Sequence, residues 1–323
     1  MHNKNFPAWI LAAILCTIGG CVIYIGDSPF PSFHAKYEKT LDLSEAMASG
    51  SHLDAVTPCG PIAVNGVDTT TCTVHVTIRT RAASEEEAEE LAEQIKVQLL
   101  NTANGLKLEA QCPKRKRRQS ISIGYDIKVP QQTGLTCKSS SGSLTLENLR
   151  GTVHAKTSSG SVHARNLGLG DVTCESSSGS VSLTEARGLG SCDLHTSSGT
   201  VKAVQVEARS LYLNSSSGGV TADHVTCEKI VGHTSSGSVR ALFTPETPAH
   251  LDAELTTSSG SVNVTLPPIF GGTIDIGTSS GSTDVDRPVT VRGKIDKKHL
   301  KGSIGEGTGR LVAKTSSGSV TVR

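Results

Sequence analysis

Serine, histidine and acidic side chains run through the whole sequence, but they are dispersed rather than clustered. The zinc-binding pattern HExxH does not occur, and no two cysteines have the CxxC spacing of a thiolate metal site. Glu175, His195 and His233 are separated by about 19 residues or multiples of it, whereas a polysaccharide-cleaving enzyme needs its acid and base at one point. The sequence therefore predicts no catalytic, cofactor-binding or metal-binding residue, and a protein that is not an enzyme.

The cysteines do not indicate a complete disulfide framework. Nine occur, and Cys16 and Cys21 belong to the N-terminal segment, which leaves an odd number in the rest of the chain. Cys59 and Cys72 flank the turn-rich segment 65–71 and are the candidate pair for a disulfide. Cys137 and Cys174 are two repeats apart and out of bonding range, so we expect them to be buried core residues.

The chain has 31 Lys and Arg and 30 Asp and Glu, for a net charge of +1, and it contains one run of consecutive basic residues. This run consists of Lys114, Arg115, Lys116, Arg117 and Arg118. Bulk attraction to nucleic acid is not expected at this net charge. The run is either a solvated hairpin tip or a contact for an anionic surface such as phospholipid headgroups, lipopolysaccharide or teichoic acid.

The N-terminal segment 1–26 carries the signal for export. Residues 6–25 form an uncharged apolar run of about 20 residues, long enough to cross a bilayer, and Lys4 before it places the rest of the chain outside the cytoplasm. Residues 18–21, Ile-Gly-Gly-Cys, resemble the lipobox of bacterial lipoproteins, which implies lipid modification of Cys21. An uncleaved membrane anchor is the alternative, because residues 22–25 remain apolar. Either reading anchors the protein to the cell envelope, facing the periplasm or the exterior.

A repeat determines how all these groups are positioned. A Ser/Thr-Ser-Ser-Gly element recurs with its glycine at positions 142, 160, 179, 199, 218, 237, 260, 281 and 318. The last spacing, 37 residues, is near twice the others and suggests one unit that has lost its signature. Residues seven and five before the glycine, and two and four after it, are apolar, with polar residues between them. Each unit is therefore expected to be a strand, a Ser-Gly turn and a second strand, both with one inward face.

Units of this kind cannot bury their apolar stripes alone, so stacking must complete the core. We predict an all-β, right-handed parallel β-solenoid over residues 131–323, with about nine to ten rungs of about 19 residues. The content of 36% hydrophobic and only 3% aromatic residues suits such a thin core. Residues 27–130 are expected to hold further strands and one amphipathic helix, 84–100, that caps the solenoid and starts with a Ser84–Glu87 capping box.

The serial SSGSV elements and the closing stretch 302–322 resemble the bacterial putative-adhesin family of exported β-strand-repeat domains, whose function is unknown. The resemblance covers about 32–323 and implies a β-solenoid without catalytic residues. The function we expect is that of a non-enzymatic, envelope-anchored adhesin or binding scaffold, whose Ser/Thr-rich face meets a glycan or a protein outside the cell. Alternatives are an envelope scaffold or stress-sensing partner protein and a polysaccharide-active β-helix enzyme.

Overall fold

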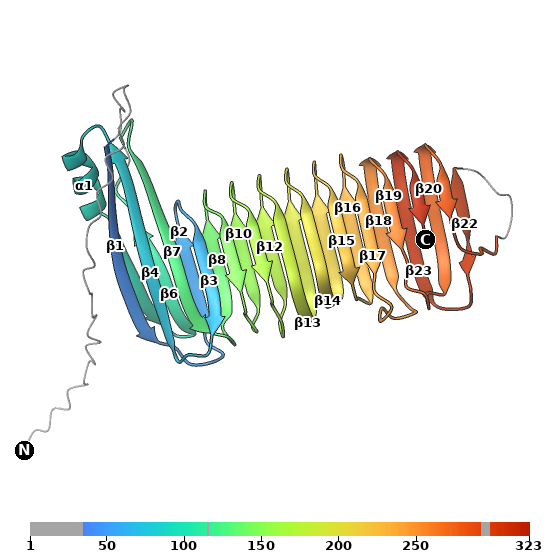
Figure 1. Cartoon of the computed structure of the whole chain (residues 1–323), viewed down its shortest axis with the longest axis horizontal. Helices are drawn as coiled ribbons and strands as arrows, with labels where there is room; N and C mark the ends of the chain where they lie inside the picture. The colour runs from blue at the N-terminus through green and yellow to red at the C-terminus, as the bar shows by residue number, and fades with distance from the viewer. Residues whose placement is uncertain (1–34, 115, 292–297) are drawn as a thin grey trace, which may run out of the picture.

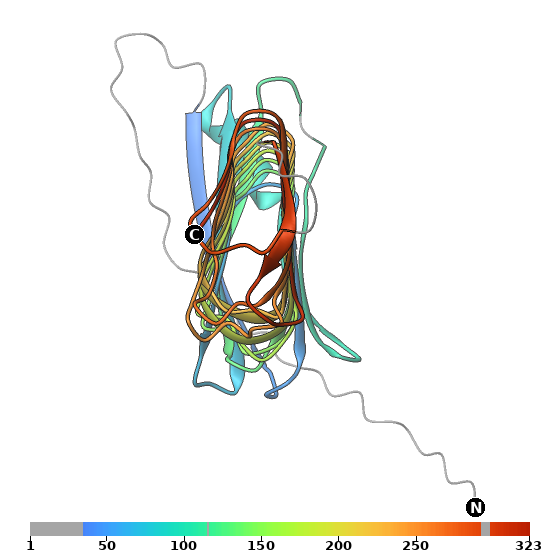
Figure 2. The ribbon, with the colours of Figure 1, turned by 90° about the vertical axis from the view of Figure 1, so that its right-hand side faces the viewer.

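The computed structural model describes residues 35–114, 116–291 and 298–323, and within them the chain is almost entirely β. Segment 1–26, with the predicted lipidation residue Cys21, and Arg115 lie outside the described residues. The strands form one long array with the one described helix near its N-terminal end (Figure 1). Viewed end-on, successive turns superpose as one flattened loop (Figure 2). None of the described residues forms a helix long and apolar enough to span a bilayer.

The elements follow one another in two blocks. The N-terminal block contains β1 (Ala35–Ala46), β2 (His52–Thr57), β3 (Ile62–Val67), β4 (Thr71–Ala82), α1 (Glu85–Glu93), β5 (Lys96–Thr102), β6 (Gly105–Gln111) and β7 (Ser120–Pro130). The repeat block contains β8 (Gly134–Ser139), β9 (Leu144–Glu147), β10 (Val153–Thr157), β11 (Val162–Arg165), β12 (Val172–Ser176), β13 (Val181–Thr196), β14 (Val201–Ser215), β15 (Val220–Val225), β16 (Lys229–Thr234), β17 (Val239–Phe243), β18 (Asp252–Ser259), β19 (Val262–Thr265), β20 (Gly272–Ser280), β21 (Thr283–Val285), β22 (His299–Ile304), β23 (Gly309–Ser317) and β24 (Val320–Val322).

Each repeat places one strand before its Ser-Ser-Gly turn and one after it, and the two sets form opposite faces of the flattened loop. The leading face, made of the strands before the turn, runs in the order β6, β2, β8, β10, β12, the second halves of β13 and β14, β16, β18, β23 and β20, all paired in parallel. The trailing face runs β7, β3, β9, β11, the first halves of β13 and β14, β15, β17, β19, β24 and β21, also in parallel.

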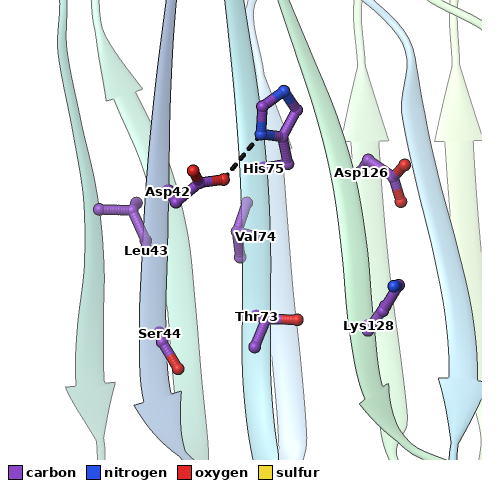
Figure 3. A pocket seen from close by; sticks show the side chains of 8 residues that line it. All are labelled: Asp42, Leu43, Ser44, Thr73, Val74, His75, Asp126 and Lys128. Carbon is purple, nitrogen blue, oxygen red and sulfur yellow. Dashed lines mark hydrogen bonds and ion pairs between the residues drawn. The ribbon is translucent and has the colours of Figure 1, made fainter. Parts of the chain in front are cut away.

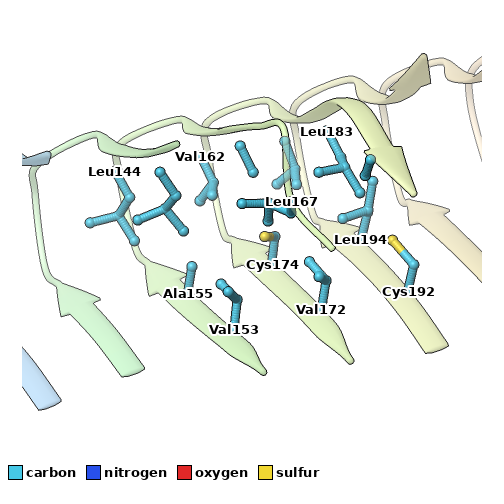
Figure 4. Close-up of a cluster of buried hydrophobic side chains, with 14 of the residues drawn as sticks. Leu144, Val153, Ala155, Val162, Leu167, Val172, Cys174, Leu183, Cys192 and Leu194 are labelled. Atoms are coloured by element: carbon cyan, nitrogen blue, oxygen red, sulfur yellow. The ribbon is translucent and has the colours of Figure 1, made fainter. Parts of the chain in front are cut away.

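The predicted inward columns form the core. Ala155 pairs with Cys137 on one side and Cys174 on the other, so equivalent positions of successive repeats lie side by side. Leu144, Val162 and Leu183 face them from the trailing side, and all are buried (Figure 4). A narrow interior of this kind is filled by aliphatic side chains, which explains the scarcity of aromatic residues.

A ladder of buried hydroxyls holds the turns together. The first residue of each Ser/Thr-Ser-Ser-Gly element points inward and donates to the carbonyl of a glycine in the neighbouring rung, at 2.7–2.9 Å. These donors are Ser139, Thr157, Ser176, Thr196, Ser215, Thr234, Thr257, Thr278 and Thr315. Several also accept the amide N–H of the glycine three residues later, as Ser139 does from Gly142 at 2.9 Å. These hydroxyls therefore provide hydrogen-bond partners for backbone groups of the turns that are shielded from water.

Close packing between rungs explains the glycine of the motif. A Cβ on Gly160 would lie 2.1 Å from the carbonyl oxygen of Gly142, and one on Gly179 would lie 2.0 Å from that of Gly160. Neither glycine has a positive φ. At these positions the glycine is therefore required by the small space between stacked backbones and not by a left-handed backbone conformation.

Chain order and stacking order differ at both ends of the array. The unit β2/β3 is inserted between β6/β7 and the first repeat, β8/β9. At the other end, the last unit of the sequence, β23/β24, lies between β18/β19 and β20/β21. The prediction of a silent unit within the 37-residue spacing was therefore wrong. Residues 299–304 form β22, which pairs antiparallel with β20 because the chain must return before its last unit is inserted.

The predicted helix 84–100 is shorter than expected. Helix α1 begins after Ser84, whose Oγ accepts the amide N–H of Glu87 at 3.2 Å, and it ends at Glu93. Residues 96–102 form β5, which pairs antiparallel with β6, because Val97 and Leu99 alternate as they would in a strand. Helix α1 packs against β1 and β4 through Ala88, Leu91 and Ala92. The predicted N-cap is confirmed and the predicted C-terminal boundary was wrong.

Candidate functional site

The two middle serines of each repeat form a ridge along one edge of the array. We call this the serine ridge; it consists of residues 140–141, 158–159, 177–178, 197–198, 216–217, 235–236, 258–259, 279–280 and 316–317, all exposed serines. Neighbouring rungs in a sheet are about 4.8 Å apart, so hydroxyls repeat at that interval. Within the described part of the chain these hydroxyls make no hydrogen bond, and both donors and acceptors face solvent. The ridge can therefore bind a polar, repetitive ligand.

A basic groove of about 450 Å³ lies at the N-terminal end of the serine ridge. Its lining includes Lys107 of β6, Lys138 of β8 and Lys156 of β10, with Ser140 and Ser158 of the ridge. Lys138 and Lys156 are direct partners on adjacent parallel strands. Two lysines at this position of adjacent strands place positive charge along one side of the groove, which favours binding of an anion.

The charges around the groove are only partly neutralised. Lys107 Nζ lies 2.5 Å from Glu109 Oε2, and Lys156 Nζ lies 2.6 Å from Glu175 Oε2. Among the described residues, Lys138 has no carboxylate within ion-pair distance. The groove therefore keeps a net positive charge close to the first hydroxyls of the ridge.

The predicted basic run lies near this groove. Ala110, at the end of β6, lines the groove, and the run starts four residues later at Lys114. Its described members Lys114, Lys116, Arg117 and Arg118 are exposed, while Arg115 lies outside the described residues. Gln119 fixes the run by accepting the Lys116 amide N–H at 2.9 Å and donating to Glu87 of α1 at 2.7 Å. The sequence predicted the run but not the groove, because Lys107 reaches Lys138 only through the insertion of β2.

Acidic and histidine side chains form a flat polar ladder further along the leading face. Glu175 pairs laterally with His195, and Asp193 lies on the same strand as His195. The hydrogen bond from Lys156 lowers the pKa of Glu175, whereas burial and the neighbouring Glu175 raise the pKa of Asp193. Opposite pKa shifts of two carboxyl groups suit a general acid and a general base, but Glu175 and Asp193 lie on a flat sheet surface that does not enclose a substrate. His195 and His233 are separated by the strand of Asn214, about 9–10 Å in all, too far to share a metal ion.

Two further observations bear on catalysis. Residues 277–281, Gly-Thr-Ser-Ser-Gly, have the GxSxG spacing of a nucleophile elbow. Ser279, however, lies near the end of β20 on the exposed ridge, and the turn that follows leads into β21 and not into a helix. Within residues 35–114, 116–291 and 298–323, no group of three potential metal ligands is found.

A second hollow, of about 480 Å³, lies on the outer surface of β1, β4 and β7 (Figure 3). His75 Nδ1 lies 2.7 Å from Asp42 Oδ1, and both side chains are about half exposed. Asp126 and Lys128 line the same hollow from β7. The hollow is lined by two carboxylates, Asp42 and Asp126, and one ammonium group, Lys128, so it does not select for an anion as the basic groove does.

The predicted Cys59–Cys72 disulfide was wrong. The carbonyl oxygen of Cys59 accepts the amide N–H of Ile123, which pairs with Ile78 of β4. Cys72 lies six residues from Ile78 along that strand, or about 20 Å, and a disulfide needs Cα atoms within about 7 Å. Burial raises the pKa of Cys72 to about 12.

The cysteines of the repeats lie in the core, as expected. Cys137, Cys174, Cys192 and Cys227 are buried. Burial raises the pKa of Cys174 and of Cys227 to about 12. Their thiols are therefore poor nucleophiles at neutral pH.

Comparison with known proteins gave a family and solved structures of low similarity. A putative adhesin of Bacteroides fragilis is 14% identical with a TM-score of 0.39, covering 88% of this chain and 97% of its own. A putative adhesin of Parabacteroides distasonis is 11% identical with a TM-score of 0.45, at 88% and 97% coverage. A putative cell adhesion protein of Clostridium sporogenes is 10% identical with a TM-score of 0.21, at 88% and 99% coverage. No protein of curated function matches the chain. The model of the Toastrack DUF4097 family matches residues 63–323, and the chain belongs to that family.

Proposed function

We propose that this protein is a non-enzymatic binding scaffold that holds an anionic polysaccharide in the basic groove and along the serine ridge. The observation that carries the proposal is the juxtaposition of Lys138 and Lys156 with Ser140 and Ser158, in a groove that opens onto the ridge. Ammonium groups bind carboxylate, sulfate or phosphate substituents, and the ridge hydroxyls exchange hydrogen bonds with sugar hydroxyls.

The elongated shape supports a polymer as the ligand. Each rung presents the same two hydroxyls, so successive sugar units meet equivalent partners, and many weak contacts add up along one chain. The basic run extends the positive surface beyond the groove and is the proposed contact for further anionic groups. Binding of this kind weakens as salt screens the charges.

The proposed scaffold is a right-handed solenoid of about nine to ten rungs, anchored to the cell envelope through segment 1–26 and facing the periplasm or the exterior. Lipid modification at Cys21 and an uncleaved membrane anchor are the two proposed anchoring modes. Support comes from the sequence of that segment: an apolar run long enough for a bilayer, preceded by Lys4 and containing the lipobox-like Ile-Gly-Gly-Cys.

A panel of immobilised polysaccharides tests the proposal: a uronate polymer, a sulfated glycan, teichoic acid and a neutral glucan. We expect the immobilised anionic polymers to retain the purified full-length chain and to release it as the salt concentration is raised. The neutral glucan should not retain it. The variant Lys138→Gln/Lys156→Gln is expected to lose most of this retention.

Lys202→Gln/Arg240→Gln is the matched control, because it removes the same two positive charges from exposed positions on the trailing face. Equal retention of both variants would show that net charge and not the groove governs binding. Absence of retention on every anionic polymer would refute the proposed ligand class.

A further inference from the structure

Cys59 and Cys112 follow two strands that are paired in parallel. Strands β2 and β6 pair from His52 with Gly105 to Val56 with Glu109, a constant offset of 53 residues. Continued by three residues, the same offset sets Cys59 opposite Cys112. Adjacent strands are about 4.8 Å apart, and the Cα atoms of a disulfide are usually 4.4–6.8 Å apart.

Contacts with β7 hold Cys59 at the side of the array where Cys112 lies. The Ile123 amide N–H donates to the Cys59 carbonyl oxygen at 2.7 Å, and Cys59 Sγ donates to the Ile121 carbonyl oxygen at 2.8 Å. Tyr125, two residues further along β7, donates its hydroxyl to the Val56 carbonyl at 3.3 Å. Cys112 is exposed and leads into the loop that returns to β7.

The groups that influence the pKa of Tyr125 agree with this placement of the two cysteines. Burial is the main reason that the pKa of Tyr125 is raised, and the nearby ionisable thiols of Cys112 and, to a smaller extent, Cys59 raise it further. Both sulfur atoms therefore lie near the same phenol. Cys72, Cys137, Cys174, Cys192 and Cys227 are buried, so Cys59 and Cys112 are the described cysteines that solvent can reach.

We propose that Cys59 and Cys112 form a disulfide that fastens the inserted unit β2/β3 to β6. The reaction is thiol–disulfide exchange with an external disulfide. One thiolate attacks that disulfide, forming a mixed disulfide and releasing one thiol; the second cysteine then displaces the other. The two cysteines lose two hydrogens and two electrons, and the external disulfide is reduced to two thiols. The bond would fix the chain two residues before the basic run, at Lys114, and does not depend on the proposed function.

The test is peptide mapping of the full-length chain in detergent, first reduced and then treated with oxidised glutathione. The expected product is a peptide pair linked through Cys59 and Cys112, absent after reduction, with the five buried cysteines still alkylated as thiols when the protein is unfolded. Cys59→Ser and Cys112→Ser should each abolish the link and leave one glutathione adduct, while Cys227→Ser should retain it.

Separate glutathione adducts on both cysteines without a linked peptide would overturn the proposal, as would thiols at both positions or a link from either residue to another cysteine. Mapping of the unsubstituted chain decides the matter even when a serine variant fails to fold.

Discussion

The substitution Thr196→Val tests whether the buried hydroxyl ladder stabilises the stack. Thr196 is fully buried; its hydroxyl donates to the Gly179 carbonyl at 2.7 Å and accepts the Gly199 amide N–H at 3.3 Å. Valine has nearly the same shape, so the change removes both hydrogen bonds and leaves no cavity.

The expected magnitude follows from these contacts. Leaving a buried partner unsatisfied costs about 1–3 kcal/mol, and the two partners of Thr196 are each partly exposed, which puts both at the low end. The additional buried methyl group offsets about 0.8 kcal/mol. We therefore expect the free energy of unfolding to fall by about 1 kcal/mol.

Urea denaturation followed by circular dichroism measures this change, with hydrogen exchange at the Gly199 amide as a local readout. Thr200→Val is the matched control, since the Thr200 hydroxyl is exposed and bonds to the exposed ridge-side hydroxyl of Ser180 at 3.1 Å. The control should change stability by less than about 0.5 kcal/mol. Equal stability of the two variants, with unchanged exchange at Gly199, would refute the role given to the ladder.

Three further predictions concern packing, charge and the proposed disulfide. Gly218→Ala should destabilise the fold by about 1–3 kcal/mol because its Cβ would lie 1.9 Å from the Gly199 carbonyl, whereas Gly219→Ala, with its nearest atom at 3.4 Å, should be close to neutral in the same urea assay. Lys156→Gln should raise the pKa of Glu175 in an NMR titration, because the hydrogen bond from Lys156 is the main cause of its lowering. The lowered pKa of Glu175 contributes folding stability at pH values above the unfolded pKa of about 4.3, and this contribution is lost as the pH falls through the folded pKa. The difference in the free energy of unfolding between the wild type and Lys156→Gln should therefore shrink on acidification. Oxidation of Cys59 and Cys112 should stabilise the chain by about 4 kcal/mol relative to the reduced form, as expected for closing a loop of about 50 residues, and a Cys112→Ser variant should show no such difference.

The repeat region was predictable because its signal is periodic and local. Val153, Ala155 and Val162 alternate with polar residues as strands require, and the recurring glycine sets the register, so the inward columns follow from the sequence alone. Lys138 and Lys156 could likewise be placed side by side, since they occupy the same position of consecutive repeats.

The ends of the array were not predictable for a related reason. The unit β23/β24 has the same pattern as its neighbours, so nothing local distinguishes stacking on β20/β21 from insertion between β18/β19 and β20/β21. At the other end, residues 96–102 carry apolar positions that fit both a helix and a strand, and pairing with β6 decides between them. The basic groove lies at this N-terminal end, where the insertion of β2 brings Lys107 of β6 near Lys138 and Lys156. The sequence therefore did not predict that the three lysines line one groove.

Lysine footprinting tests the central claim, that the basic groove binds an anionic polysaccharide, most directly. The chain is acetylated briefly with and without a uronate polymer, and modification of each lysine is quantified by mass spectrometry. We predict strong protection of Lys138 and Lys156 and none of Lys202, which lies on the trailing face. Unchanged acetylation of Lys138 and Lys156 at a polymer concentration that retains the protein, or equal protection of Lys202, would contradict the account.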